Sequence, residues 1–319
     1  MCSHGLYGSS FKIRINVDRF KKITCAGNIG DALVRFFVEN PPAHNHGLYH
    51  YTSILSFTKI LESNTMLLSA ANELNDLQEP SDDNVYIGSF SYGGIENVAM
   101  WGIYAQPLKA SVRLKFTYLE LKHLVESSGK EGCLLPVVER NGEYRVLYEC
   151  GSAVSVIGKN LLSDVLYVDY YSGKRDKVMV RWNNQALSVP IGVVEDLRKR
   201  QLLGLVKYSG WAYERETRIC VQAKINEGLA RGKEEGGWKL SKGRLALWLN
   251  PDIIKSCSVI GGPCVSQEDL RAKINATKMN NGSIKVSEIG ESKLRGLLRG
   301  GIFCRGCADT EHCRTYHAS

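Results

Sequence analysis

The chain has 319 residues, of which 44% are hydrophobic and 23% are charged, ordinary values for a protein that buries a core. Lysine and arginine number 41 against 33 aspartate and glutamate residues, which gives a net charge of +8. No run of ~18 apolar residues and no apolar signal region is present, which argues against membrane-spanning and secreted classes. We therefore expect a cytoplasmic protein without a membrane partner, whose ten cysteines are reduced thiols.

Strands and helices are expected to follow one another irregularly. In chain order we expect strand 48–52, helix 53–63, strands 66–70 and 85–91, helix 96–105, strand 110–116 and helix 117–127. The second half is expected to hold strands 143–150, 164–171 and 178–182, a basic helix at 192–206, strands 214–222, 245–249 and 256–262, helix 267–274 and strand 283–289. Because these elements do not form regular βα pairs, they favour an α+β fold over a doubly wound sheet.

The ends of the chain differ from its middle. Residues 1–45 are predicted to be an N-terminal extension that ends in the linker-like stretch PPAHNHG. Residues 46–275 would form the main domain, and residues 276–319 a C-terminal extension rich in cysteine and histidine. Between residues 197 and 244, twelve Lys/Arg residues face five glutamates. This surplus suits an anionic partner such as nucleotide or nucleic acid, although a solvated charged surface would explain it as well.

A histidine lies in the first expected strand, LYHYT. Side chains alternate along a strand, so Leu48, His50 and Thr52 should share one face, while Tyr49 and Tyr51 share the other. His50 and Thr52 would then offer hydrogen-bonding groups side by side. A single histidine on a strand is nevertheless more often a satisfied core residue than a functional one.

Two glutamates stand two residues apart in the stretch WAYERETRI. At the start of a strand, Glu214 and Glu216 should point to the same side, with Arg218 next along. A buried pair of carboxylates is costly unless it has a task, such as holding ribose hydroxyls or stabilising positive charge. The alternative is a solvent-facing strand edge on which the glutamates pair with Arg218.

Three further stretches carry polar or aromatic groups. The loop from Asn75 to Glu79 is either a turn or part of a site. The strand ending SFS places the hydroxyls of Ser89 and Ser91 just before two glycines, and MWGIYA places Trp101 and Tyr104 on one helix face. Such an aromatic pair more often belongs to a core than to a cofactor site.

The C-terminal tail contains a set of residue types that bind metals. A structural zinc site is chemically feasible because a tetrahedral Zn²⁺ accepts three thiolates and one imidazole. A terminus without metal is the alternative. The candidate ligands are Cys304, Cys307, Cys313 and His317.

The order of these motifs is more specific than any one of them. The chain reads YHYTS, ND-x-x-E, SFS, MW-x-x-Y and W-x-x-E-x-E-x-R, followed by IIKSCSVIGG. This pattern resembles a largely uncharacterised bacterial domain family of the ADP-ribosyltransferase-like superfamily. The resemblance covers roughly residues 46–275. It implies a split, mixed or antiparallel β-sheet core with flanking helices.

The resemblance also implies roles for individual residues. Glu216 would be the catalytic glutamate, Glu214 would orient the acceptor, and His50 would serve both catalysis and NAD binding. NAD would be the substrate, and its ADP-ribose would pass to a protein or nucleic acid, as in a bacterial toxin or phage-defence effector. Lys207 and Arg218 are candidates to meet the pyrophosphate. The other implied NAD-binding residues are Tyr51, Thr52, Ser89, Ser91, Trp101 and Tyr104.

Two other functions fit the same residues. One is a non-catalytic module that binds a nucleotide or a nucleic acid and has a zinc-binding tail. The other is an NAD glycohydrolase, in which water is the acceptor. The presence or absence of a labelled macromolecule would distinguish hydrolysis from transfer, and metal content would support the binding module.

Overall fold

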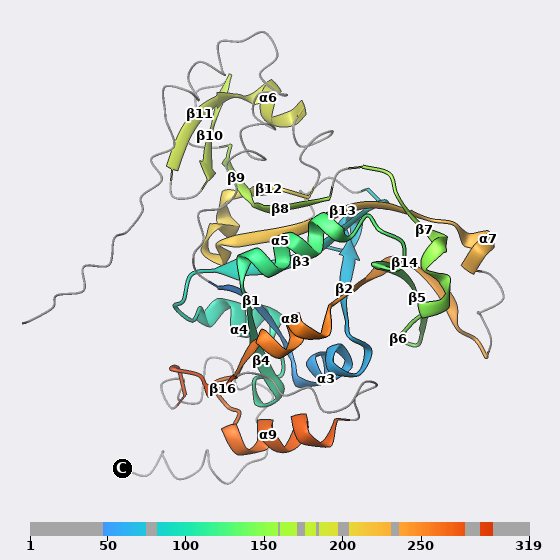
Figure 1. Cartoon of the computed structure of the whole chain (residues 1–319). Coiled ribbons are helices and arrows are strands. Elements are labelled where there is room, and N and C mark those ends of the chain that lie inside the picture. Colours follow the sequence, from blue (N-terminus) through green and yellow to red (C-terminus); the bar gives the residue numbers. More distant parts are fainter. Residues whose placement is uncertain are drawn as a thin grey trace, which may run out of the picture.

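The computed structural model describes residues 47–74, 82–158, 160–170, 176–182, 185–196, 204–230, 236–277 and 288–295. These residues form an α+β fold of mixed, mostly antiparallel sheets with several helices (Figure 1). The α+β class expected from the sequence is therefore confirmed. No helix among the described residues is long and apolar enough to cross a membrane.

Among the described residues the larger sheet has twelve strands, in the order β16-β15-β4-β1-β3-β2-β14-β5-β6, with β13 joined to β3, β7 and β8. The smaller sheet has the order β11-β10-β9-β12. The strands of the larger sheet are β1 Leu48–Ser53, β2 Thr65–Ala70, β3 Val85–Tyr92, β4 Ser111–Phe116, β5 Leu134–Arg140, β6 Glu143–Val146, β7 Val154–Val156, β8 Leu161–Asp164, β13 Glu216–Ile225, β14 Lys239–Trp248, β15 Ser258–Gly261 and β16 Glu288–Glu291. Those of the smaller sheet are β9 Leu166–Asp169, β10 Lys177–Trp182, β11 Gln185–Pro190 and β12 Val206–Tyr208.

The helices are short. The α-helices are α3 Ile54–Ser63, α4 Val98–Tyr104, α5 Tyr118–Ser127, α6 Ile191–Asp196, α7 Glu227–Ala230, α8 Pro251–Ser256 and α9 Gln267–Ala276. The 3₁₀ helices are η1 Ala71–Glu73, η2 Leu108–Ala110, η3 Tyr148–Ala153 and η5 Ser209–Glu214. Ser53 was expected to begin the first helix, and its side chain does accept the amide hydrogen of Ser56, 3.0 Å away.

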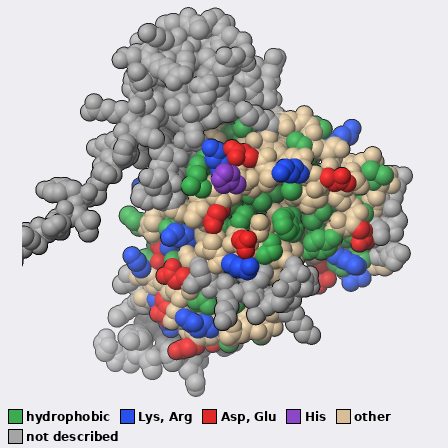
Figure 2. All heavy atoms as spheres, in the orientation of Figure 1, with side chains coloured by type: hydrophobic (Ala, Val, Ile, Leu, Met, Phe, Trp, Pro, Cys, Tyr) green, Lys and Arg blue, Asp and Glu red, His purple; other side chains and the backbone are tan. Residues whose placement is uncertain are grey.

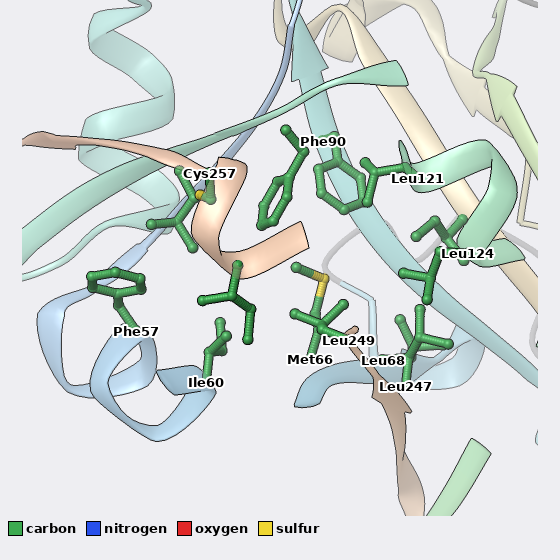
Figure 3. Packing of buried hydrophobic residues seen from close by; sticks show 14 of the residues in the cluster. Phe57, Ile60, Met66, Leu68, Phe90, Leu121, Leu124, Leu247, Leu249 and Cys257 are labelled. Carbon is green, nitrogen blue, oxygen red and sulfur yellow. The ribbon is translucent and has the colours of Figure 1, made fainter. Parts of the chain in front are cut away.

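The main core lies between one face of the larger sheet and helices α3, α5, α8 and α9, which all contribute buried apolar side chains to it. Figure 3 shows side chains of this core, among them Phe57 and Ile60 of α3 and Phe90 of β3, with Met66 and Leu68 of β2 close to Leu249. Burial raises the pKa of the Cys257 thiol in this core to about 12, so the side chain packs as an apolar group. The five described cysteines form no disulfide with one another.

The sheet divides along one edge of β3. At one end of this edge β1 pairs with β3, through Tyr49 and Ser91, and at the other end β2 pairs with it, through Ser69 and Ile87. The opposite edge of β3 is occupied along its length by β13. The two strands joined by α3 therefore separate where they meet β3, instead of pairing with each other. Beyond residue 275, β16 continues the sheet by pairing in parallel with β15.

Several sequence-based boundaries were wrong. The helix expected over 192–206 ends at Asp196, residues 197–203 lie outside the described residues, and Val206 already belongs to β12. The strand expected over 143–150 stops at Val146 and is followed by η3, and that expected over 164–171 is interrupted at Val165. Strands β5, β7 and β11 were not expected, and β8 was expected only at Asp164. Pro136 weakens the strand pattern of β5, although the Asn141-Gly142 turn, with positive φ at both residues, is a hairpin signal.

The start of α5 gives a test of local stability. Thr117 and Glu120 form a reciprocal capping box, in which the threonine hydroxyl accepts the Glu120 amide hydrogen. We expect Thr117→Ala to lower the free energy of unfolding by about 1 kcal/mol, measured by urea titration. Thr58→Ala, within α3, is the control and should not destabilise, because alanine favours helix interiors. Equal losses in both variants would contradict the capping role.

Candidate active site

The two glutamates of WAYERETRI meet beside β12. Glu216 is the first residue of β13, whereas Glu214 is the last residue of η5. The expectation that both lie on one strand was therefore wrong, although their carboxylates do converge. Arg215, between them, has a left-handed backbone with φ 47°, and this conformation turns the chain from η5 into the strand.

The carboxylates form one network with two cations. The ammonium of Lys207 lies 2.6 Å from Glu214 Oε2 and 3.2 Å from Glu216 Oε2. The guanidinium of Arg218 donates from Nε to Glu216 Oε1 at 2.7 Å and from Nη1 to the carbonyl of Gly204 at 2.6 Å. All four charged residues are buried, with exposed fractions between 1% and 6%. This excludes the alternative of a solvent-facing strand edge.

Polar and aromatic groups surround this network. The hydroxyl of Tyr104 donates to Glu214 Oε1 at 2.5 Å, and the hydroxyl of Ser91 donates to the Glu214 carbonyl at 2.7 Å. The Glu216 amide donates to the hydroxyl oxygen of Tyr167 at 2.9 Å. The Lys207 ammonium also lies 4.8 Å from the centre of the Trp211 ring, a cation–π contact. The glutamates are thus held by contacts from β3, α4, β9 and β12.

The two carboxylates differ in proton affinity. Burial by itself would raise the pKa of Glu216, but the charges of Arg218 and Lys207, with hydrogen bonds from Arg218 and Ser89, hold this pKa at about 2. The pKa of Glu214 is raised, first by burial and then by the charge of Glu216, with Lys207 and Tyr104 partly offsetting the rise. Glu216 is therefore the carboxylate that stays ionised.

Strand register shows which predicted residues share a face of the sheet. Glu216 pairs with Ser91, and Ser91 pairs with Tyr49, so these side chains lie on one face. Alternation places Arg218, Ser89 and Tyr51 on that same face. Helix α4 covers it, because Trp101 packs edge-on against Tyr51 with ring centres 4.9 Å apart. The predicted residues on this face are Tyr51, Ser89, Ser91, Trp101, Tyr104, Glu214, Glu216 and Arg218.

His50 and Thr52 lie on the opposite face. The His50 ring packs against Phe90 of the main core, with centres 5.7 Å apart. Its Nδ1 donates to the Ser89 carbonyl at 3.0 Å, and burial lowers its pKa, so the ring is neutral at pH 7. The resemblance implied that His50 and Glu216 belong to one site. The structure instead places them on opposite faces of the sheet.

His50 and Thr52 instead border a separate hollow. This cavity of about 860 Å³ lies along α3 and β2 and is also lined by Lys59, Tyr144 and Arg145. Neither Glu214 nor Glu216 lines it. The cavity and the carboxylate network are therefore two distinct places in the fold.

Some of the basic residues between 197 and 244 are buried and do not contribute to a positively charged surface. Lys207 and Arg218, two of its members, are buried in ion pairs with the glutamates. On the face shown in Figure 2, the described Lys and Arg side chains are interspersed with Asp and Glu. Direct contact of Lys207 or Arg218 with a pyrophosphate stays a prediction, and their burial favours a role in holding the glutamates.

Sequence reasoning missed one contributor to the site and the role of another. Lys207 was expected to meet a pyrophosphate, and its place between the glutamates follows from the pairing of β12 with β9. Tyr167 carried no local signal, because it reaches Glu216 from 49 residues away. Among the described residues no cluster of His, Cys, Asp and Glu could hold a metal. The predicted zinc ligands of the tail, the N-terminal extension and the Asn75–Glu79 loop lie outside the described residues.

Comparisons with known proteins identify no relative of this chain. No protein-family model, curated protein or solved structure gives a significant match to this chain. The resemblance therefore rests on its motifs, and the geometry around Glu216 carries the functional argument.

Proposed function

We propose that the chain transfers ADP-ribose from NAD to a macromolecular acceptor, protein or nucleic acid, with Glu216 as the catalytic carboxylate. The observation that carries the proposal is a buried glutamate held ionised by two cations, inside a shell of hydroxyl and aromatic groups. A fixed negative charge away from water stabilises a developing positive charge strongly.

The reaction needs such a charge. As the bond between ribose C1′ and the nicotinamide nitrogen breaks, the electron pair goes to nicotinamide and neutralises its pyridinium charge. Positive charge then develops on C1′ and the ring oxygen, opposite the Glu216 carboxylate. A lone pair of the acceptor forms the new bond to C1′, and the acceptor's proton is lost. The raised pKa of Glu214 suits this carboxylate to receive that proton.

Contact distances assign the two oxygens of Glu216 different tasks. Oε1 is held at 2.7 Å by Arg218, whereas Oε2 has the longer contact of 3.2 Å to Lys207. Oε2 is therefore the oxygen that a ribose hydroxyl would engage, with Lys207 remaining on Glu214. Tyr104 and Trp101 on α4 would flank the nicotinamide ring.

Two aspects of the fold bear on the proposal. The separation of β1 and β2 along β3 supports a split-sheet architecture of the ADP-ribosyltransferase-like kind. His50 lies on the other face of this sheet, so in the proposed mechanism it does not touch the reacting ribose. Its hydrogen bond to the Ser89 carbonyl would instead hold β1 against β3, which carries Ser89 and Ser91 to the site.

The test is NAD turnover by the full chain. Purified protein, adenine-labelled NAD and a bacterial lysate would be combined, and nicotinamide release and labelled macromolecules would be measured. We expect release with labelling, and a loss of at least about 100-fold in Glu216→Gln. Glu268→Gln, an exposed glutamate on α9, is the matched control and should keep full activity.

Each other outcome has a defined meaning. Nicotinamide release without a labelled macromolecule would replace transfer by hydrolysis. Release that survives in a folded Glu216→Gln variant would remove Glu216 from the chemistry. Absence of release from the folded wild-type protein would contradict the proposed function and favour the binding module.

A further inference from the structure

A buried arginine lies on the same sheet face as Glu216 and belongs to none of the motifs. Arg113 is in the middle of β4, where it pairs with Tyr51 of β1 on one side and with Ile260 of β15 on the other. Its guanidinium carbon lies 4.4 Å from the centre of the Tyr49 ring and 5.8 Å from that of Tyr51. Arg113 is 3% exposed.

The positive charge of Arg113 has no carboxylate partner among the described residues. Among the residues that the structure describes, no aspartate or glutamate forms an ion pair with it. Its Nη1 donates to the Tyr51 hydroxyl oxygen at the long distance of 3.4 Å, and its Nε is buried without any hydrogen-bond partner. The tyrosine rings compensate the charge in part, but a buried N–H without an acceptor is costly to the fold.

This environment contrasts with that of Arg218, on the same face. Arg218 is equally buried, yet its Nε bonds to Glu216 and its Nη1 to the Gly204 carbonyl. The described part of the chain thus satisfies the Nε of one buried guanidinium and leaves the Nε of the other without an acceptor. A guanidinium with a free Nε matches the paired oxygens of a phosphate or carboxylate.

We propose that Arg113, backed by Tyr49 and Tyr51, is an anion site that binds the pyrophosphate of a nucleotide ligand. Alternation along β4 places Lys115, which is exposed, on the same face as Arg113, so a second cation lies two residues further along the strand. The anion supplies the acceptor that Nε lacks and the negative charge that the buried guanidinium lacks.

The position of this site relative to Glu216 suits one extended ligand. Register runs from Glu216 through Ser91 and Tyr49 to Lys115, that is, across three strand spacings or roughly 14 Å. Because α4 packs on Tyr51, a dinucleotide that reaches both places would pass beside α4, with a ribose near Glu216 and its pyrophosphate towards β4. The identification of the ligand as NAD rests on the proposed function, whereas the anion site itself does not.

Calorimetric titration of the full chain tests the site with three probes: inorganic pyrophosphate, ADP-ribose and adenosine, which lacks the anion. We expect pyrophosphate and ADP-ribose to bind to the wild-type protein, and Arg113→Met to weaken both by at least about tenfold. Arg113→Lys keeps the charge but loses the paired geometry, and should weaken both by a smaller factor. Adenosine should not distinguish the variants.

The control is an arginine with a similar ring contact but a different environment. Arg140 lies 4.8 Å from the centre of the Trp238 ring, is exposed, and donates to the Gly236 carbonyl. Arg140→Met should leave the binding of all three probes unchanged. Without ligand, Arg113→Met should melt at or above the wild-type temperature, because an unpaired buried charge is removed.

Four results would count against these proposals. Unchanged pyrophosphate and ADP-ribose affinity in Arg113→Met, or no binding of either to wild type, would overturn the anion site. If Arg113→Met fails to fold, undiminished affinity in Arg113→Lys would count equally against it. Anion binding without NAD cleavage would contradict the proposed function and leave the site intact.

Discussion

Replacing Lys207 with methionine is expected to lower the free energy of unfolding by about 3–5 kcal/mol. Lys207 is buried and lies within 3.2 Å of both Glu214 and Glu216. Without its ammonium, two carboxylates remain in a buried site, and the described groups that still compensate them are Arg218, Ser89 and Tyr104. Urea unfolding at pH 7 measures the loss.

A double variant separates electrostatics from packing. Adding Glu214→Gln to Lys207→Met removes one of the stranded charges, so the double variant should recover part of the lost stability. Lys242→Met is the matched control, since Lys242 has an equally short ion pair, 2.7 Å to Glu227, but is exposed. That variant should unfold like the wild type. A loss in the double variant equal to the sum of both single losses would show that repulsion between the glutamates is not the cause.

Local signals in the sequence predicted the elements that depend on local physics. The cap at Ser53 and the alternation of Tyr49 and Tyr51 against His50 follow from rules that act over a few residues, and the structure has both. The grouping of Glu214 with Glu216 was also correct, although for the wrong local reason. A left-handed residue, Arg215, accomplishes what strand alternation was expected to do.

The pairing of strands distant in the sequence determines which face of the sheet each side chain occupies, and local sequence patterns do not reveal this pairing. Whether His50 shares a face with Glu216 depends on how β1, β3 and β13 pair, because a shift of one residue moves a side chain to the other face. The pairs Tyr49–Ser91 and Ser91–Glu216 place Tyr49, and not His50, on the glutamate face. The cation between the glutamates likewise comes from a strand, β12, which was not expected and whose first residue, Val206, was assigned to a helix.

The stability of the protein should depend on pH through Glu216. Its pKa of about 2 in the fold lies below the ordinary value of 4.5, so its ionised form stabilises the fold above pH 4.5. This contribution is lost as the pH falls from about 4.5 to about 2, and amounts to roughly 3 kcal/mol. The stability advantage of the wild type over Glu216→Gln should therefore shrink across this window, as urea titrations at several pH values would show. A constant difference would contradict the proposed charge state, and Glu268→Gln should differ little from wild type throughout.

The contribution of Glu214 to stability should change with pH in the direction opposite to that of Glu216. Two independent surface carboxylates would not show this difference. Because burial and the charge of Glu216 raise the pKa of Glu214, its ionisation at neutral pH opposes folding. As the pH falls through this raised pKa towards 4.5, the wild type should gain stability relative to Glu214→Gln. Below 4.5 the loss from Glu216 takes over, so the two variants bracket a stability maximum in mildly acidic solution. Curves of the same sign for both variants would mean that Lys207 holds both carboxylates ionised alike, and Glu214 would then lose its assigned part in taking up the acceptor's proton.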